Sequence, residues 1–166
     1  PWFAPVESLA HLREMVVREG YPLVLKPVDS RGARGVLRLT PDVDLEWAYG
    51  LSRSHSPTGR VMIERFLDGP QISTESIVLN GVAYTPGFSD RNYEFLERYA
   101  PHIIENGGEL PSRLSPDVQQ AVRHVVQVAA LSLGVPNGVV KGDIVVHRGR
   151  PCVIEMAARL SGGSGA

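Results

Sequence analysis

Segments with the residue pattern of β-strands follow one another directly along much of this chain, and this feature constrains the fold most strongly. The clearest example is Asn80-Gly81, a dipeptide typical of two-residue hairpin turns because both residues tolerate positive φ angles. It joins an expected strand over residues 71–79 to another that begins at residues 82–84. Two strands joined by so short a turn must run antiparallel.

A second expected hairpin lies near the end of the chain, where strands over residues 138–147 and 151–157 flank the turn Arg148-Gly149-Arg150. Shorter apolar runs predict three more strands, over residues 21–28, 36–39 and 60–67. Strands outnumber helices and mostly follow one another, so the sequence predicts an α+β fold with mainly antiparallel sheets.

Three helices are expected beside these strands. Apolar residues at helical spacing predict the first over residues 6–19. Thr40-Pro41-Asp42 combines an N-cap residue, a proline and a first-turn acid, so the second is expected to begin there and end near residue 54. Ser115-Pro116-Asp117 opens the third. Its expected apolar face consists of Val118, Ala121, Val122, Val125 and Ala129.

Composition excludes several classes of function. The 166 residues carry a net charge of −1 without a basic cluster, so nucleic acid is not an indicated partner. No apolar run approaches the roughly 18 to 20 residues that cross a bilayer, so no membrane partner is expected. The single cysteine and the absence of a signal-peptide pattern favour a cytoplasmic location. Both ends look cut, so we expect a fragment of a longer enzyme.

A glycine-containing loop follows Lys26, which stands near the end of an expected strand. Glycines allow the backbone to approach a bulky anion, and successive N–H groups can bind phosphate oxygens. The alternative, a flexible hairpin with solvated arginines, is equally compatible with these residues alone. The loop residues that we consider candidates are Ser30, Gly32, Ala33, Arg34, Gly35 and Val36.

A possible adenine-binding edge follows the expected strand over residues 60–67, at Glu64, Arg65, Phe66 and Leu67. A strand end can offer one backbone donor and one acceptor to an adenine ring, with apolar neighbours on either side. Taken alone, the residues favour the simpler alternative of an ordinary strand that ends in a turn.

Two carboxylates form the most informative pattern. If the last hairpin is symmetric about Gly149, Asp143 and Glu155 lie opposite each other, with Cβ atoms about 5 Å apart. Two carboxylates at that distance repel each other, and a divalent cation such as Mg²⁺ removes the repulsion. If the strand that contains Glu155 continues to residue 159, the side chain of Arg159 lies on the same side of the sheet as the two carboxylates. The alternative is a register shifted by one residue, which would turn one carboxylate to the other face.

In order and spacing, these pieces resemble the ATP-grasp superfamily. The resemblance is carried by Leu25-Lys26-Pro27 with its glycine loop, by the run from Glu64 to Gly69, and by Asp143 with the run from Glu155 to Gly163. It is strongest to the carboxylate–amine ligase branch, near the catalytic domains of biotin carboxylase and carbamoyl phosphate synthetase.

This resemblance implies two lobes, over about residues 1–67 and 68–166, that grasp ATP between them. Lys26 would contact the α-phosphate, the loop over residues 30–36 would cover the other phosphates, and residues 64–67 would frame the adenine. Asp143 and Glu155 would hold Mg²⁺, with Mn²⁺ as an alternative ion. Arg159 would stabilise the transferring phosphoryl group.

The implied reaction is ligation of a small carboxylate to an amine or a thiol through an acyl phosphate. Two positions depart from the usual pattern, because relatives usually carry an asparagine where Ala157 stands and often an acid where Gln71 would contact the ribose. Two alternatives therefore stay open: bicarbonate activation as in biotin carboxylase, and a nucleotide-binding module without catalysis. Relatives often dimerise, so a homodimer of the longer enzyme is also compatible. The isolated chain is expected to be inactive.

Overall fold

The computed structural model describes residues 1–161, which form two compact units. The first contains Pro1–Phe66 together with Tyr93–Asn106, and the second contains Leu67–Asn92 together with residues 107–161. The segment Tyr93–Asn106 thus packs with the first unit although it lies in the range expected for the second lobe. Each unit has one antiparallel sheet and its own helices, which confirms the α+β class.

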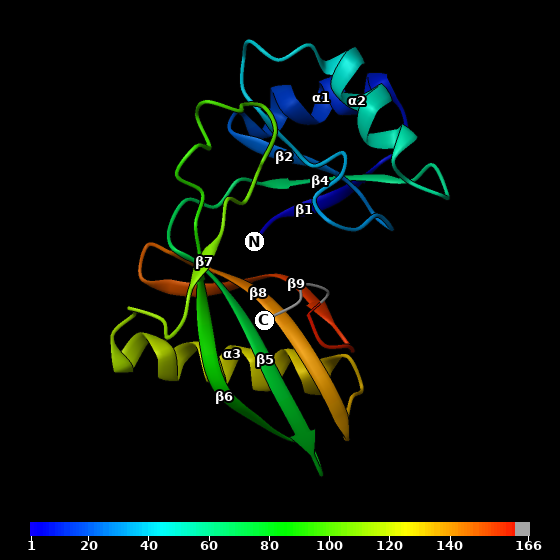
Figure 1. Cartoon of the computed structure of the whole chain (residues 1–166). Helices are drawn as coiled ribbons and strands as arrows, with labels where there is room; N and C mark the ends of the chain where they lie inside the picture. The colour runs from blue at the N-terminus through cyan, green and yellow to red at the C-terminus, as the bar shows by residue number, and fades with distance from the viewer. Residues whose placement is uncertain (162–166) are drawn as a thin grey trace. The chain divides into compact units, whose positions relative to one another are not determined.

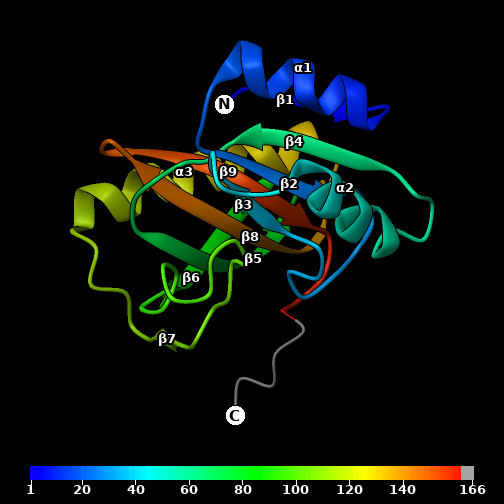
Figure 2. The same ribbon diagram turned by 90° about the horizontal axis from the view of Figure 1, so that it is seen from above.

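The first unit is a four-stranded sheet with two helices on one face (Figure 1). In chain order it contains β1 (Phe3–Val6), α1 (Leu9–Glu19), β2 (Leu23–Pro27), β3 (Leu37–Leu39), α2 (Leu45–Ser54) and β4 (Val61–Arg65). The strands lie in the order β1-β4-β2-β3, and Figure 2 shows β4 and β2 side by side. Alternate residues of the strands face the helices and are fully buried, including Leu23, Leu25, Leu37, Leu39 and Ile63.

Both helices begin later than the sequence predicts. Val6 belongs to β1, and α1 starts after Ser8, whose hydroxyl accepts a hydrogen bond from the His11 amide at 3.1 Å. The second helix starts after Asp44, whose carboxylate accepts from the amides of Glu46 and Trp47 at 2.8 and 3.2 Å. The expected start at Thr40 is therefore wrong, because Asp44 supplies the acceptor for the unpaired amides of the first turn.

The second unit is a five-stranded sheet with one helix across a face (Figure 1). Its elements are β5 (Gln71–Leu79), β6 (Val82–Arg91), β7 (Gly108–Glu109), α3 (Pro116–Ser132), β8 (Gly138–His147) and β9 (Arg150–Ala157). The strands lie in the order β7-β6-β5-β8-β9. The expected bounds of β5 and β8 are confirmed. Asn80 and Gly81 have φ angles of 49° and 78°, as the predicted hairpin turn requires.

The helix α3 packs on the sheet through a narrower line of residues than the sequence predicts. Val122, Val126 and Ala130 are fully buried, each one helical turn from the next. Val125 and Ala129, which were expected on this face, are only half-buried. The sheet therefore contacts a face rotated slightly from the predicted one. Opposite the helix, the core contains Ile72, Val78, Phe88, Val140 and Ile144.

The segment Tyr93–Asn106 extends the β3 edge of the first unit. The amide of Arg38 donates to the carbonyl of Pro101 at 2.8 Å, and Leu37 forms an isolated bridge with His102. The Arg38 guanidinium also binds both carboxylate oxygens of Glu97, at 2.7 Å each. This planar arrangement of two hydrogen bonds fixes both the orientation of the segment and its distance from β3.

Candidate functional site

The first unit presents its candidate nucleotide-binding residues on the sheet face opposite the helices. Lys26 on β2 and Glu64 on β4 point away from the buried core, and Lys26 Nζ lies 2.7 Å from Glu64 Oε1. Their side chains are 17% and 20% exposed, so the ion pair is only partly solvated. The structure thus brings together two residues that the sequence assigned to separate parts of the nucleotide site.

Other groups of the expected adenine edge already have partners within the first unit. The Arg65 amide donates to the Trp2 carbonyl at 3.1 Å, and its guanidinium donates to the Glu19 carbonyl at 2.9 Å. The ring of Phe66 lies under the Arg38 guanidinium, 5.5 Å from its central carbon. The Arg65 amide is therefore not available to an adenine ring in this conformation.

The glycine loop has the backbone that its sequence predicts. Gly32, Ala33 and Gly35 have φ angles of 66°, 56° and 74°, and the Val36 amide donates to the Ala33 carbonyl at 3.2 Å. Residues 31–34 are exposed, whereas Gly35 is buried. A non-glycine residue at positive φ costs about 1 kcal/mol, so Ala33 marks a conformation that its neighbours impose.

The second unit has a polar sheet face on the side opposite α3. Register places Ser73 of β5 beside Asp143 of β8, and Asp143 opposite Glu155 of β9. The predicted pairing of the two carboxylates is therefore confirmed. Because alternate residues of a strand share a face, the same face carries further polar side chains. These are Gln71, Glu75, Arg91 and Lys141.

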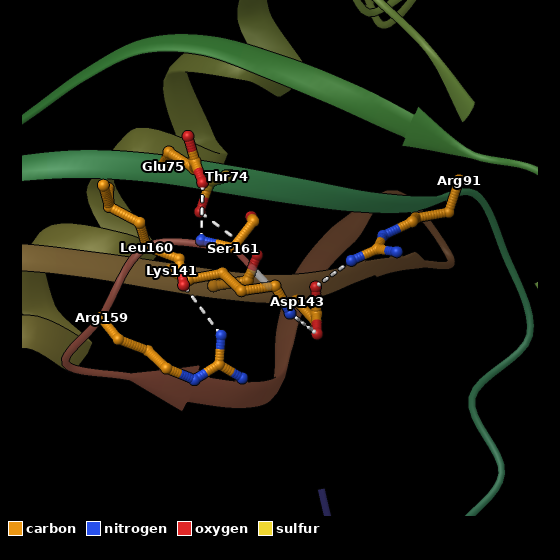
Figure 3. Close-up of polar contacts among 9 residues, drawn as sticks. Thr74, Glu75, Arg91, Lys141, Asp143, Arg159, Leu160 and Ser161 are labelled. Atoms are coloured by element: carbon orange, nitrogen blue, oxygen red, sulfur yellow. Dashed lines mark hydrogen bonds and ion pairs between the residues drawn. The ribbon is translucent and has the colours of Figure 1, made fainter. Parts of the chain in front are cut away.

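Two positively charged side chains bind Asp143 (Figure 3). Arg91 Nη2 lies 3.0 Å from Asp143 Oδ1, and Lys141 Nζ contacts Oδ2. Lys141 is a buried lysine with 9% exposure, which this ion pair stabilises. Arg91 is the last residue of β6, and its side chain is 21% exposed.

The donor set fits a divalent cation that is carried by a nucleotide. Asp143 and Glu155 supply two carboxylates, and the buried hydroxyl of Ser73, beside Asp143 in register, has no hydrogen-bond partner among residues 1–161. Within residues 1–161, no group of three or more His, Cys, Asp or Glu side chains has the geometry to hold a metal ion. Mg²⁺ commonly takes its remaining ligands from phosphate oxygens and water, so two carboxylates are sufficient.

The segment after β9 is held by Glu75. The strand ends at Ala157, so Arg159 is exposed on a bend rather than on a continued strand, and it donates to the Leu160 carbonyl at 2.8 Å. The Ser161 amide donates to Glu75 Oε1 at 2.7 Å (Figure 3). Hydrogen bonds from the Ser161 hydroxyl and amide lower the pKa of Glu75, and Lys141 lowers it further. The glycines that follow in this motif lie outside the described residues.

Sequence reasoning missed Lys141 and Glu75. A signal for Lys141 exists, because it stands two residues before Asp143 in the same strand and must share its face. Glu75 carries no such local signal, since its partner Ser161 is 86 positions away along the chain.

Comparison with known proteins places the chain in a family. Residues 5–163 match the model of the ATP-grasp domain. Over 138 residues, 80% of this chain, it is 40% identical to formate-dependent phosphoribosylglycinamide formyltransferase of Paraburkholderia xenovorans strain LB400. The aligned region is 33% of that relative, so the chain spans about a third of its length.

Two solved structures share the fold. An L-amino acid ligase from Bacillus licheniformis superposes with a TM-score of 0.76 and 25% identity, over 98% of this chain and 36% of that one. The second is the biotin carboxylase domain dimer of Hydrogenobacter thermophilus 2-oxoglutarate carboxylase, in complex with MgADP, ADP and bicarbonate. It superposes with a TM-score of 0.73 and 20% identity, over 94% of this chain and 35% of that one. Among the described residues, no helix has both the length and the apolar character to cross a bilayer. The chain belongs to the ATP-grasp domain family.

Proposed function

We propose that this chain is the ATP- and Mg²⁺-binding part of a ligase that activates a carboxylate as an acyl phosphate and transfers the acyl group to an amine or a thiol. The observation that carries the proposal is the opposed pair Asp143 and Glu155. The positively charged side chains of Arg91 and Lys141 lie beside this pair on the same polar face. Such a face can hold both a metal-bound polyphosphate and the negative charge that develops during phosphoryl transfer.

The first unit would contribute contacts to the nucleotide. Lys26 can donate to a phosphate oxygen while it stays paired with Glu64, because an ammonium group has three N–H donors. The exposed amides of the glycine loop can bind the terminal phosphates as a nest of donors. Phe66 and Leu67 offer apolar surface to the adenine.

The second unit would contribute the metal ligands and charge neutralisation. Asp143 and Glu155 would bind Mg²⁺, which supplies charge neutralisation of the phosphates when bound. Arg91 and Lys141 hold Asp143 in place and neutralise the face when the two carboxylates have no cation between them. Arg159, exposed next to this face, would contact the phosphoryl group in transfer.

The proposed reaction has two balanced steps. A carboxylate oxygen of the substrate attacks the γ-phosphorus of ATP, and the bond from that phosphorus to the bridging oxygen breaks to release ADP. The amine nitrogen then attacks the acyl carbon, inorganic phosphate leaves, and the amine gives up one proton. Both steps depend on positioning and on stabilisation of negative charge rather than on a covalent enzyme intermediate.

The test is capture of the acyl phosphate with hydroxylamine in the protein at its natural length, with ATP, Mg²⁺ and a panel of carboxylates. The proposal predicts a hydroxamate that is lost in Arg159→Ala and retained in Arg148→Ala, an exposed arginine of the β8–β9 turn. ADP release that needs bicarbonate and biotin, without hydroxamate, would indicate a carboxylase instead. Nucleotide binding without any turnover or metal requirement would indicate a non-catalytic module.

A further inference from the structure

Both ends of the glycine loop are bound to one short segment of the first unit. This segment, residues 52–58, contains the last turn of α2 and the turn that follows it, and we call it the loop anchor. It is itself well fixed, because the Ser56 amide donates to the Arg53 carbonyl at 3.1 Å and the Arg60 amide donates to Ser56 Oγ at 2.9 Å.

The first end of the loop is held through Asp29. The Ser56 hydroxyl donates to Asp29 Oδ1 at 2.5 Å, and Thr58 donates to Oδ2 from its hydroxyl at 2.5 Å and from its amide at 3.2 Å. Hydrogen bonds to an ionised carboxylate are about twice as strong as those between neutral groups. Arg60 completes the arrangement by donating from Nε to the Thr58 hydroxyl at 3.0 Å.

The second end is held through Gly35. The fully buried hydroxyl of Ser52 donates to the Gly35 carbonyl at 2.6 Å. A Cβ at Gly35 would lie 3.0 Å from both His55 Cβ and Pro27 Cγ, so the backbone fits closely between these two side chains. Glycine at position 35 therefore allows both the close contact with the loop anchor and the positive φ angle.

Between the two fixed ends, residues 31–34 are exposed, and the backbone hydrogen bond that the Val36 amide donates to the Ala33 carbonyl is local to this stretch. Movement of the loop is thus confined to a few residues whose ends are a fixed distance apart. Fixing the ends of a short loop lowers the entropy that it loses when it closes on a ligand.

We propose that the loop anchor sets the position from which the glycine loop closes on nucleotide phosphates, with Asp29 and Ser52 as its positioning residues. The part of this proposal that concerns phosphates rests on the proposed function. The part that concerns anchoring of the loop ends does not, and the two can be tested separately.

The direct test is limited proteolysis with trypsin at Arg31 and Arg34, in the chain without ligand. A protease must draw a longer stretch of chain into its site than the four exposed residues, so cleavage requires release of an end. Asp29→Ala and Ser52→Ala should each raise the cleavage rate by about five- to tenfold, as expected for loss of hydrogen bonds that hold a locally opening segment. Asp29→Asn, which keeps one acceptor, should give a smaller increase.

Matched controls come from the same unit. Ser54→Ala removes a hydroxyl of α2 that donates to the Leu51 carbonyl within its own helix, and Asp42→Ala removes an exposed carboxylate that accepts from Thr40. Neither should change the rate. If Ser52→Ala fails to fold because its site is buried, Asp29→Ala alone decides the question. Cleavage at the wild-type rate in a folded Asp29→Ala protein would overturn the proposal.

A second arm tests the link to phosphate. Asp29→Ala should weaken binding of a non-hydrolysable ATP analogue about fivefold or more and leave adenosine binding unchanged, because adenosine has no phosphates for the loop to cover. Equal loss for both ligands would overturn the positioning role and indicate general disruption. If the wild type binds neither ligand, the proposed function fails, while the cleavage rates without ligand still decide whether the ends are anchored.

Discussion

Asp143 and Glu155 lie opposite each other across β8 and β9, although the turn between these strands would pair Asp143 with Ile154. The turn has two residues, and its register pairs His147 with Arg150 and Ile144 with Val153. The register then shifts between Ile144 and Asp143, which leaves Ile154 as an extra residue in β9. Such a β-bulge is a recurrent way to redirect a side chain beside an active site.

The bulge places two carboxylates where they repel each other unless a cation is present. At a separation of about 5 Å and an effective dielectric constant near 20, the repulsion is about 3 kcal/mol. Arg91 and Lys141 offset this energy in the conformation described, through contacts with Asp143. Two positively charged side chains thus lie beside the two carboxylates that we propose as metal ligands.

The ion pair of Lys141 with Asp143 can be tested by a double-mutant cycle. Asp143→Asn leaves the buried Lys141 ammonium without its anionic partner, and we expect a loss of about 3 kcal/mol in the free energy of unfolding. Lys141→Met should cost less, since Asp143 keeps Arg91. The double variant should recover part of the loss, because no unpaired buried charge remains. Urea denaturation gives the free energy of unfolding of the wild type, the two single variants and the double variant. If the loss in the double variant equals the sum of the two single losses, the two residues are not coupled.

The start of α2 can be tested with two substitutions. Asp44→Ala removes the acceptor for two first-turn amides and should lower the free energy of unfolding by about 1 kcal/mol. Thr40→Ala, at the residue that the sequence favours as the cap, should have a smaller effect because Thr40 lies outside the helix. Thermal or urea unfolding of the two variants gives the comparison. The reverse order of the two losses would show that the helix begins earlier.

Local signals explain which parts of the fold could be predicted. The Asn80-Gly81 turn and the start of α3 depend on the backbone preferences of the residues themselves, so the sequence is sufficient for both. Strand β1 depends instead on pairing of Phe3 with Glu64, and the segment Tyr93–Asn106 depends on contacts with β3. Partners so distant along the chain leave no local pattern in either segment.

In the candidate site, too, local sequence signals predict some features, whereas others depend on the folded strands. The opposition of Asp143 and Glu155 was predicted from a turn centred on Gly149, whereas the turn is centred between Arg148 and Gly149 and the bulge restores the pairing. Two departures from the assumed geometry therefore cancel. Arg91 reaches Asp143 because β6, for which the sequence predicts only the start, continues to Arg91 and brings this residue to the polar face.

The interaction of Glu75 with Ser161 should make stability depend on pH. The folded-state pKa of Glu75 is lowered from 4.5, chiefly by hydrogen bonds from Ser161, so its contribution is fully present above the unfolded-state pKa. That contribution is lost as the pH falls through the lowered value. The difference in unfolding free energy between wild type and Glu75→Gln should thus be constant above about pH 5.5 and shrink below 4.5.

Direct titration provides the control for this prediction. The side-chain carboxyl of Glu75, followed by NMR in the folded protein, should titrate below 4.5. A pKa of Glu75 at or above 4.5 would show that the Ser161 contacts do not form in solution.

The measurement that tests the central claim most directly is calorimetric titration of a non-hydrolysable ATP analogue, with and without Mg²⁺. Wild type, Glu155→Ala and the control Glu14→Ala should be compared. We predict that Mg²⁺ strengthens binding at least about tenfold, or 1.4 kcal/mol, in wild type and in the control, and that Glu155→Ala abolishes this gain. A gain that persists unchanged in a folded Glu155→Ala protein would contradict a metal site built on the opposed carboxylates.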